Sequence, residues 1–220
     1  FNVFGMPFFF QNDAEATDVQ QKLTPILEQR LEAKGFHLLA WGSGGWVQLF
    51  SKKPLRTLDD VKQAKLYTSQ GDDRMVEWYK NNGFHPVALS ANDIPAQLKL
   101  TTGMIDTAPS PPYPALVLQI FRDAKYMLDV RVAPLVGALV MTNTAWNKID
   151  AADQKVVLDA AKAFQTRILT DAPKQDAESV TTMKARGLQV TTLSPQAAAE
   201  FHTAAEKKVA FTLGISGVAE

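Results

Sequence analysis

The sequence predicts an α/β protein in which helices alternate with short strands. Apolar residues recur every three or four positions in several long segments, short apolar runs lie between these segments, and capping residues or glycines mark many boundaries. Such alternation is typical of a sheet that is mostly parallel. With 220 residues, 46% of them hydrophobic, the chain is long enough for one large domain or two small ones with a buried core.

The first half of the chain opens with an apolar stretch followed by a capped helix. Asn12 is predicted to cap a helix over 13–34, which Gly35 ends. The Gly-Ser-Gly-Gly segment at 42–45 is predicted to form a turn or hinge between two strands. The other elements expected here are strands over 36–41 and 46–50, a helix after the capping box Thr57–Asp60, a strand over 65–68, a helix over 72–82, a strand over 84–89, a helix over 90–102 opened by a second capping box at Ser90, and a strand over 104–106.

A proline-rich segment separates the two halves of the chain. Four prolines lie within positions 109–114, and because proline lacks a backbone N–H, this segment is predicted to be a rigid extended loop outside any sheet. A long helix is predicted to begin at Asp150, and Pro173 is expected to kink or end it. The remaining predicted elements are a helix over 115–122, strands over 126–130, 135–143 and 188–193, resumed helix to Arg186, and a last helix to about Leu213 with Ser194 as its N-cap.

Composition excludes several classes of protein. Lys and Arg number 23 and Asp and Glu also number 23, so the net charge is zero, which argues against nucleic-acid binding and against charge-driven binding to a membrane surface. No run of 18 apolar residues occurs, so we expect no direct membrane insertion. The absence of cysteine excludes thiol catalysis, disulfides and cysteine-ligated zinc.

The sequence contains no pattern that indicates catalysis. Its three histidines, His37, His85 and His202, are far apart and lack metal-ligand spacing, and no nucleophile elbow, P-loop or dinucleotide fingerprint occurs. Paired aspartates at 59–60 and 72–73 are explained by helix capping, and Lys207-Lys208 is expected to be solvated. We therefore expect no metal, no cofactor and no catalytic residue, and the sequence favours a binding cleft.

Aromatic residues are the first candidates for contact with a ligand. Trp41, Trp46, Tyr67 and Tyr113 fall at predicted strand ends or in loops. In α/β sheets, ligands bind beyond the carboxyl ends of the strands, although a buried position in the core is the commoner fate of a tryptophan. The core and ligand interpretations stay equally open for Trp41, while ligand contact is favoured for Tyr67 and Tyr113.

The order of short motifs resembles that of one receptor family. The segments that carry the likeness are Phe4–Phe10, Gly45–Phe50 followed by Lys52-Lys53-Pro54, Thr57–Lys62 followed by Lys65-Leu66, Gly83–Val87, Leu98–Asp106, and Trp146 with Ile149–Gln154. Each is weak alone, but in order and at fitting spacings they span almost the whole chain. Together they resemble the extracytoplasmic solute receptors of TRAP transporters, the DctP-like family.

The resemblance implies a two-domain fold like that of periplasmic binding proteins, with a ligand cleft between the domains and a long helix over 150–186 that spans both. It implies a discontinuous domain I of residues 1–46 plus 135–173 and a domain II of residues 47–134 plus 174–220, with roughly the first third of the receptor, part of domain I, absent from this chain. It also implies a periplasmic location, the membrane subunits of a TRAP permease as partners, and delivery of a small organic solute to them.

Departures from the family pattern shape the predicted site. The family usually binds a ligand carboxylate with an arginine at the position of Tyr67, a second arginine often stands where this chain has Val47, and Ser110 replaces an asparagine. Tyrosine and valine cannot replace a bidentate guanidinium clamp. The solute is therefore expected to be aromatic or neutral, or a carboxylate bound by another group, Arg74 or Arg131. The predicted ligand-binding residues are Trp41, Trp46, Gln48, Tyr67, Arg74, Ser110 and Tyr113. A ligand-binding sensor or an enzyme on the same fold remains the alternative.

Overall fold

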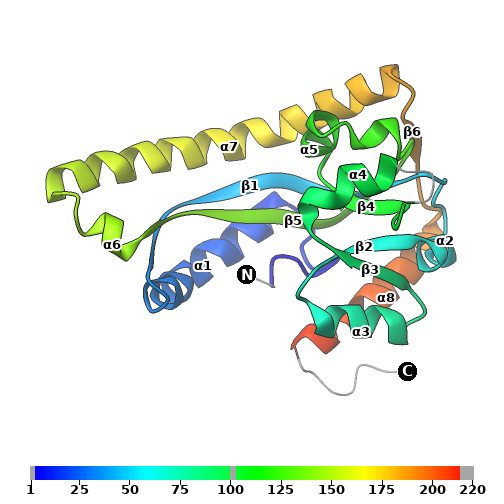
Figure 1. Ribbon diagram of the computed structural model, residues 1–220, viewed down its shortest axis with the longest axis horizontal. Helices are drawn as coiled ribbons and strands as arrows, with labels where there is room; N and C mark the ends of the chain where they lie inside the picture. The colour runs from blue at the N-terminus through cyan, green and yellow to red at the C-terminus, as the bar shows by residue number, and fades with distance from the viewer. Residues whose placement is uncertain (1–2, 100–102, 214–220) are drawn as a thin grey trace.

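The computed structural model describes residues 3–99 and 103–213 and has a mixed α/β architecture (Figure 1). The elements in chain order are α1 (Asp13–Glu32), β1 (Phe36–Ser51), α2 (Leu58–Gln63), β2 (Lys65–Ser69), α3 (Asp73–Asn81), β3 (His85–Leu89), the 3-10 helix η1 (Ala91–Asp93), α4 (Ile94–Lys99), β4 (Thr107–Ser110), α5 (Pro112–Val117), the 3-10 helix η2 (Ile120–Arg122), β5 (Tyr126–Thr142), α6 (Asn143–Trp146), α7 (Ala151–Ala185), β6 (Gln189–Thr191) and α8 (Pro195–Leu213).

One mixed sheet of six strands organises the described residues. Its strand order is β3-β2-β4-β1-β5-β6. β1 runs antiparallel to β4 and β5, whereas β2 is parallel to β3 and β4, and β5 is parallel to β6. The sheet is thus less uniformly parallel than the alternation of elements predicted, because its two longest strands form an antiparallel pair.

β1 is one continuous strand, so the turn predicted at 42–45 is wrong. Gly42 pairs with Gly137 and Ser43 with Val136, and the register shifts before the next pair, Trp46 with Pro134. This irregularity accommodates Gly45, whose φ of +90° suits a bulge. The same pairing joins the two strands predicted over 126–130 and 135–143 into β5. The neighbouring long strand supplies the hydrogen bonds that keep the glycines extended.

β4 contains Pro109, so the prediction that 109–114 lies wholly outside the sheet is wrong, as is the strand predicted over 104–106. In the antiparallel register, Pro109 is opposite Leu49. The Lys52 N–H donates to the carbonyl of Asp106, three residues before Pro109, so Lys52 and Asp106 form a hydrogen-bonded pair. Because bonded and non-bonded pairs alternate along an antiparallel ladder, Pro109 occupies a non-bonded position where no N–H is needed. Helix α5 then begins at Pro112, where a missing N–H is also tolerated.

Local capping predictions are mostly confirmed. Asn12 and Asp150 accept hydrogen bonds at the starts of α1 and α7, and Thr57 forms the expected capping box. Ser90 makes no side-chain cap and precedes a 3-10 turn instead, so the second capping box is wrong. Pro173 lies inside α7, which is 35 residues long and continues past the proline to Ala185. The expected end of the helix at Thr102 falls outside the described residues.

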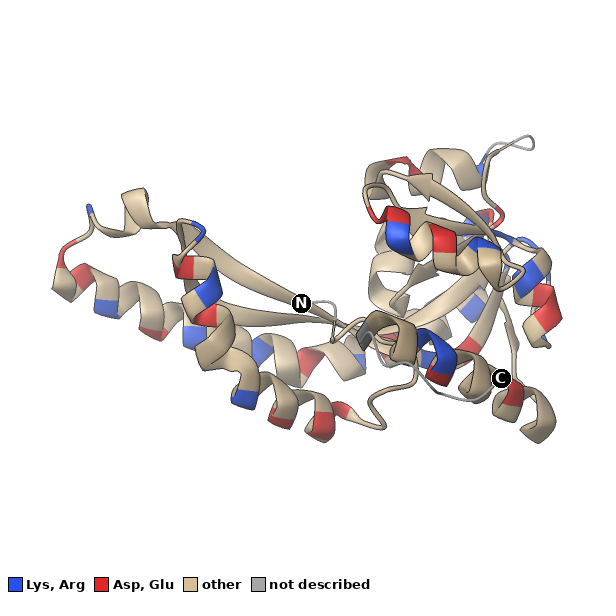
Figure 2. Cartoon of the chain, turned by 90° about the horizontal axis from the view of Figure 1, so that it is seen from below, with Lys and Arg blue, Asp and Glu red and all other residues tan. Residues whose placement is uncertain are grey.

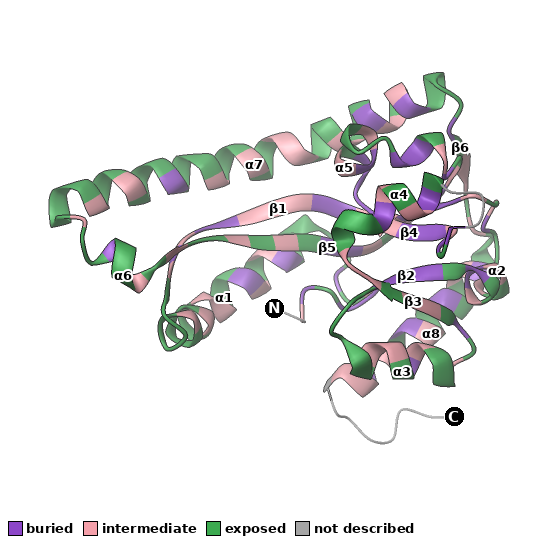
Figure 3. Ribbon diagram, in the orientation of Figure 1, coloured by how far each residue is buried: buried purple, intermediate pink, exposed green. Residues whose placement is uncertain are grey.

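Helices cover both faces of the sheet, with separate cores beneath them. One cluster, which includes Phe50, Tyr67 and Met127, packs under α4, α5 and the end of α7, and the other includes Leu49, Leu66 and Leu128 under α2, α3 and α8. Neighbours along each strand therefore face opposite cores, as the pleat requires. Figure 3 shows buried residues concentrated where these helices meet the strands.

An extended arm, formed by the β1–β5 ribbon with α1, α6 and the first part of α7, lies at the end of the molecule opposite β2, β3 and β4 (Figure 1). Figure 1 shows α7 on one side of the β1–β5 ribbon and α1 on the other, with α6 at the tip. Figure 2 shows acidic and basic residues interspersed along the helices. Among the described residues there is no helix with the length and apolarity that crossing a membrane requires. The domain division at 1–46 plus 135–173 and 47–134 plus 174–220 stays a prediction.

Candidate functional site

A cavity of about 600 Å³ lies at the carboxyl ends of β2 and β4. The end of β2 contributes Tyr67, Thr68 and Ser69, and β4 contributes Ser110. The rest of the lining comes from α2, α3, α8, the start of α5, the middle of β1 and β5, and the segment 5–8. The carboxyl edge of neighbouring parallel strands is the usual place for a ligand in an α/β sheet. This cavity is therefore the candidate functional site.

Two of the seven predicted ligand contacts, Tyr67 and Ser110, line this cavity. Tyr67 is 9% exposed, its ring packs in the core cluster that contains Phe50, and its hydroxyl lies 3.4 Å from Ser69 Oγ. The Ser110 hydroxyl donates to the Pro111 carbonyl at 2.9 Å. Each hydroxyl has an intramolecular neighbour and remains able to form a further hydrogen bond with a solute.

The two predicted tryptophans are buried and do not line the cavity. Trp41 donates from Nε1 to Thr24 Oγ1 at 2.9 Å, and Trp46 donates from Nε1 to Asp13 Oδ1 at 2.8 Å. Both partners belong to helix α1, so these indole hydrogen bonds connect α1 to β1. Neither residue is among those that line the cavity.

The other three predicted contacts also lie outside the cavity lining. Gln48 has a buried Oε1 with no hydrogen-bond partner among the described residues. The Arg74 guanidinium donates to the Phe211 carbonyl at 2.7 Å and lies 4.6 Å from the centroid of that ring. Tyr113 is 46% exposed, and its backbone N–H donates to Asp176 Oδ1 at 2.9 Å. Gln48 is nevertheless the cross-strand partner of Ser110 in the β1–β4 register. Contact of these three residues with a ligand stays a prediction.

Two polar residues of the cavity were missed by the sequence reasoning. The Lys208 ammonium, expected to be solvated, donates to Tyr79 Oη and lies 4.2 Å from the centroid of that ring. Thr68 Oγ1 is buried and has no hydrogen-bond partner among the described residues. A threonine on the core-facing side of β2, in phase with Leu66, was a visible signal for Thr68. No sequence signal existed for Lys208, because its partner is 129 residues away.

Asp176 forms a polar junction between α7, β1 and α5. Its carboxylate accepts hydrogen bonds from the backbone N–H groups of Tyr113 and Trp46, and Gly45 lies directly against it. Burial raises the pKa of Asp176, and these two hydrogen bonds and the charge of Arg131 only partly oppose that effect. The carboxylate thus joins the long helix to the middle of the ribbon, near the predicted domain crossing.

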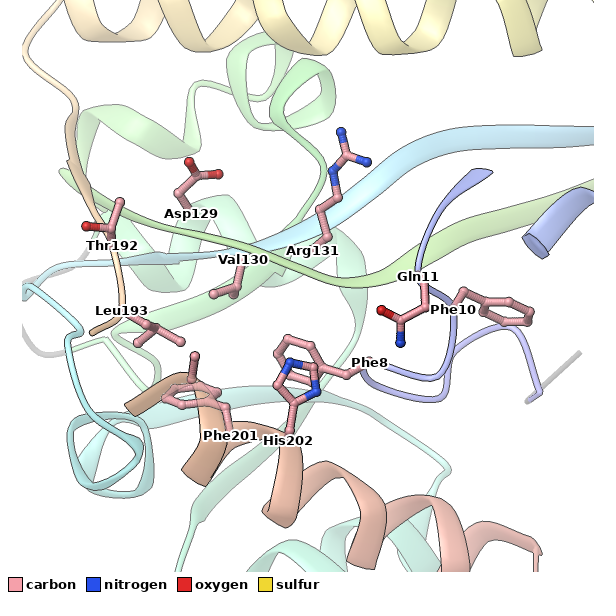
Figure 4. Close-up of a pocket in the computed structure, with 11 residues that line it drawn as sticks. Phe8, Phe10, Gln11, Asp129, Val130, Arg131, Thr192, Leu193, Phe201 and His202 are labelled. Atoms are coloured by element: carbon pink, nitrogen blue, oxygen red, sulfur yellow. The ribbon is translucent and has the colours of Figure 1, made fainter. Parts of the chain in front are cut away.

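A second cavity, of about 370 Å³, lies between β5, the segment that follows β6, α8 and residues 8–11 (Figure 4). Phe8, Phe201 and His202 gather on one side of β5, while Asp129 and Arg131 extend from the opposite face of that strand. The His202 and Phe8 rings lie 4.9 Å apart between centroids and are tilted by 56° to each other. Its charged groups do not converge with its aromatic ones, so this cavity is the weaker candidate.

The described residues offer no cluster of three or more His, Cys, Asp or Glu side chains placed to hold a metal ion. The candidate site instead combines an apolar and aromatic lining with a few hydroxyl groups and one ammonium group. Such a lining is typical of sites that bind small organic molecules through shape and a few polar contacts.

The family profile described as "Bacterial extracellular solute-binding protein, family 7", or DctP, matches residues 1–213. The chain belongs to the DctP family. Curated relatives include an uncharacterized protein of Haemophilus influenzae, 26% identical over 76% of this chain and 50% of its own length, and a solute-binding protein of Verminephrobacter eiseniae, 26% identical over 86% of this chain and 56% of its own length. This DctP-family chain spans about half the length of these relatives.

Solved structures share the fold of this DctP-family chain. DctP7 of Bordetella pertussis, an extracytoplasmic solute receptor that binds pyroglutamic acid, has a TM-score of 0.87 at 22% identity, covering 98% of this chain and 70% of its own. A TRAP periplasmic solute-binding protein of Haemophilus influenzae with bound L-gulonate has a TM-score of 0.85 at 23% identity, covering 96% and 70%. These matches confirm the predicted binding-protein fold with its long helix, and the family assignment places the protein in the periplasm.

Proposed function

We propose that this protein is a periplasmic receptor that captures a small organic solute and delivers it to the membrane subunits of a TRAP-type permease. The observation that carries the proposal is a cavity at the carboxyl ends of β2 and β4 in a chain of the DctP family. Tyr67 and Ser110 are the ligand contacts we propose from the predicted set. Membership of a solute-binding family supports release of the solute unchanged, without catalysis.

The chemistry of the lining narrows the kind of solute. The solved relatives bind pyroglutamic acid, L-gulonate and β-D-galacturonate, all small organic acids. In this chain tyrosine occupies position 67, and the cavity lining contains no arginine among the described residues. A neutral hydroxyl contributes less to carboxylate binding than a charge-assisted hydrogen bond does. This difference supports a solute that is more apolar than a sugar acid.

Capture is proposed to involve closure of the two predicted domains. β1, β5 and α7 run the length of the molecule and would connect the domains (Figure 1). Extended crossings of this kind permit hinge motion around a ligand.

A screen of thermal stability tests the proposed function. The protein is heated with organic acids, aromatic compounds and sugars, and a true solute raises the melting temperature because it binds only the folded state. Small-angle scattering is then recorded with and without the best solute, and we expect the radius of gyration to fall on binding. A protein stabilised by none of these compounds would contradict the receptor function, and an unchanged radius at saturation would contradict hinge closure.

A further inference from the structure

Lys208 is the single basic residue among the described residues that line the candidate cavity. The lining has one acidic residue, Asp72, whose Oδ1 accepts the backbone N–H of Met75 at 3.3 Å and so caps α3. That carboxylate is already paired with the positive end of a helix. The ammonium of Lys208 is therefore the charge in this cavity that is left to attract a ligand.

The ammonium of Lys208 is held by aromatic groups rather than by an acid. It donates to Tyr79 Oη and lies 5.9 Å from the centroid of the Trp78 ring. It makes no salt bridge with any Asp or Glu that the structure describes. An ammonium group has three N–H donors, and the phenol oxygen accepts one of them. Two donors and the full positive charge remain for a ligand.

Thr68 provides a second free polar group in the same cavity. The residue is 8% exposed, and its Oγ1 has no hydrogen-bond partner among the described residues. On the adjacent strand, the Thr107 hydroxyl donates to Ser51 Oγ at 2.8 Å, which is the usual state of a buried hydroxyl. A buried hydroxyl without a partner lowers stability, so Thr68 is explained best by a ligand that supplies the missing hydrogen bond.

We propose that Lys208 and Thr68 form the subsite that binds the carboxylate of the solute, and that the solute is a small monocarboxylic acid with an apolar or aromatic body. The proposal rests on the proposed receptor function and deepens it. One ammonium group matches one carboxylate. Trp78, Met75 and Leu135 give the same cavity apolar surface, against which the hydroxyls of a sugar acid would lose their hydrogen bonds.

The subsite replaces the missing guanidinium by a different route. Position 67 lies on β2, whereas Lys208 enters the cavity from α8, so the carboxylate would be held on the α8 side of the sheet. A lysine attracts a carboxylate as a point charge and does not impose the planar geometry of a guanidinium pair. Selectivity among acids then depends on how well the apolar body fits the cavity.

Calorimetry with phenylacetate and phenylacetamide tests the subsite, because these probes have nearly the same size and differ in charge. We expect the wild type to bind phenylacetate at least about tenfold more tightly than the amide, as hydrogen bonds to charged groups allow. In Lys208→Gln this preference should disappear. It should survive in Lys207→Gln, the matched control on the exposed neighbour, and be largely kept in Lys208→Arg.

Each other outcome separates the subsite from the receptor function. Equal binding of acid and amide by the wild type would overturn the subsite without the need for any variant, as would an unchanged preference in folded Lys208→Gln. Binding of galacturonate but not of phenylacetate would overturn the solute class and leave the receptor function standing. A wild type that binds no compound of the wider screen would overturn both.

Discussion

Gly45 is expected to be one of the most sensitive positions of the arm. A Cβ placed there would lie 2.1 Å from Asp176 Oδ2, closer than any real contact, and the backbone φ is +90°. Gly45→Ala must therefore strain its own backbone and displace a carboxylate that accepts hydrogen bonds from the Tyr113 and Trp46 N–H groups. The perturbation affects the junction of α7, β1 and α5 together.

The size of the effect follows from these two parts. Alanine in a left-handed conformation costs about 1–2 kcal/mol. Each hydrogen bond to a charged group contributes about 1.5–3 kcal/mol, and the lower value applies because Asp176 is only partly buried. We expect Gly45→Ala to lower the free energy of unfolding by about 4–5 kcal/mol, which corresponds to a melting temperature lower by about 8–20 °C in a domain of this size.

Thermal and urea unfolding, followed by circular dichroism, measure this loss, and Gly71→Ala is the matched control. Gly71 has a φ of +91° but no atom within 4 Å of the position of its Cβ, so its substitution isolates the backbone cost. In an Asp176→Ala background, Gly45→Ala should cost no more than Gly71→Ala does. A loss of stability equal to that of Gly71→Ala in the wild-type background would refute the reasoning.

Three further predictions concern the cavity and the junction. Tyr67→Arg should shift preference from monocarboxylates towards dicarboxylates in calorimetry with a panel of acids, and tight wild-type binding of a dicarboxylate that this variant leaves unchanged would contradict the assigned role. Thr68→Val should raise the melting temperature without ligand while weakening acid binding, whereas Thr107→Val should lower it; destabilisation by both would remove the case for an unpaired Thr68 hydroxyl. Burial raises the pKa of the Asp176 carboxyl group above its ordinary value of 3.8, so the folded state binds the carboxyl proton more tightly than the unfolded state does. The stability that Asp176 contributes should therefore fall as the pH rises from 3.8 through the raised pKa. Melting curves of the wild type and Asp176→Asn across acidic pH check the sign, which would be wrong if the wild type gained stability relative to the variant as pH rose.

Local features of the fold were predictable from the sequence. The caps at Asn12, Thr57 and Asp150 were predicted correctly, because an N-cap is a contact between residues three positions apart. The cap predicted at Ser90 was wrong because the chain continues there as a 3-10 turn, in which the Ser90 side chain forms no capping hydrogen bond.

Strand continuity depended on partners that local patterns do not contain. Glycines at 42–45 predict a turn by themselves, yet β5 supplies a ladder that keeps them extended. Pro109 by itself predicts an interruption of the strand, but it occupies a non-hydrogen-bonded position of the antiparallel register, where no N–H donor is required. Pro173 likewise sits within a helix that packs along β1, so tertiary contacts outweigh its local preference.

The candidate site was predictable only in part, because several of its contacts join residues that are far apart in the sequence. Motif order indicated the family. Tyr67 was singled out by its place at the end of a predicted strand, and Ser110 by the resemblance to the family; both line the cavity.

The sequence by itself determined composition, the local caps, the class of the fold and the motif order, because these depend on neighbours along the chain. Only the tertiary structure decided that Lys208 meets Tyr79 across 129 residues, that the Thr68 hydroxyl finds no partner within the described part of the chain, and that Asp176 joins α7 to β1. Those contacts arise when helices pack on a sheet, so their energies depend on distances in space that no local pattern encodes.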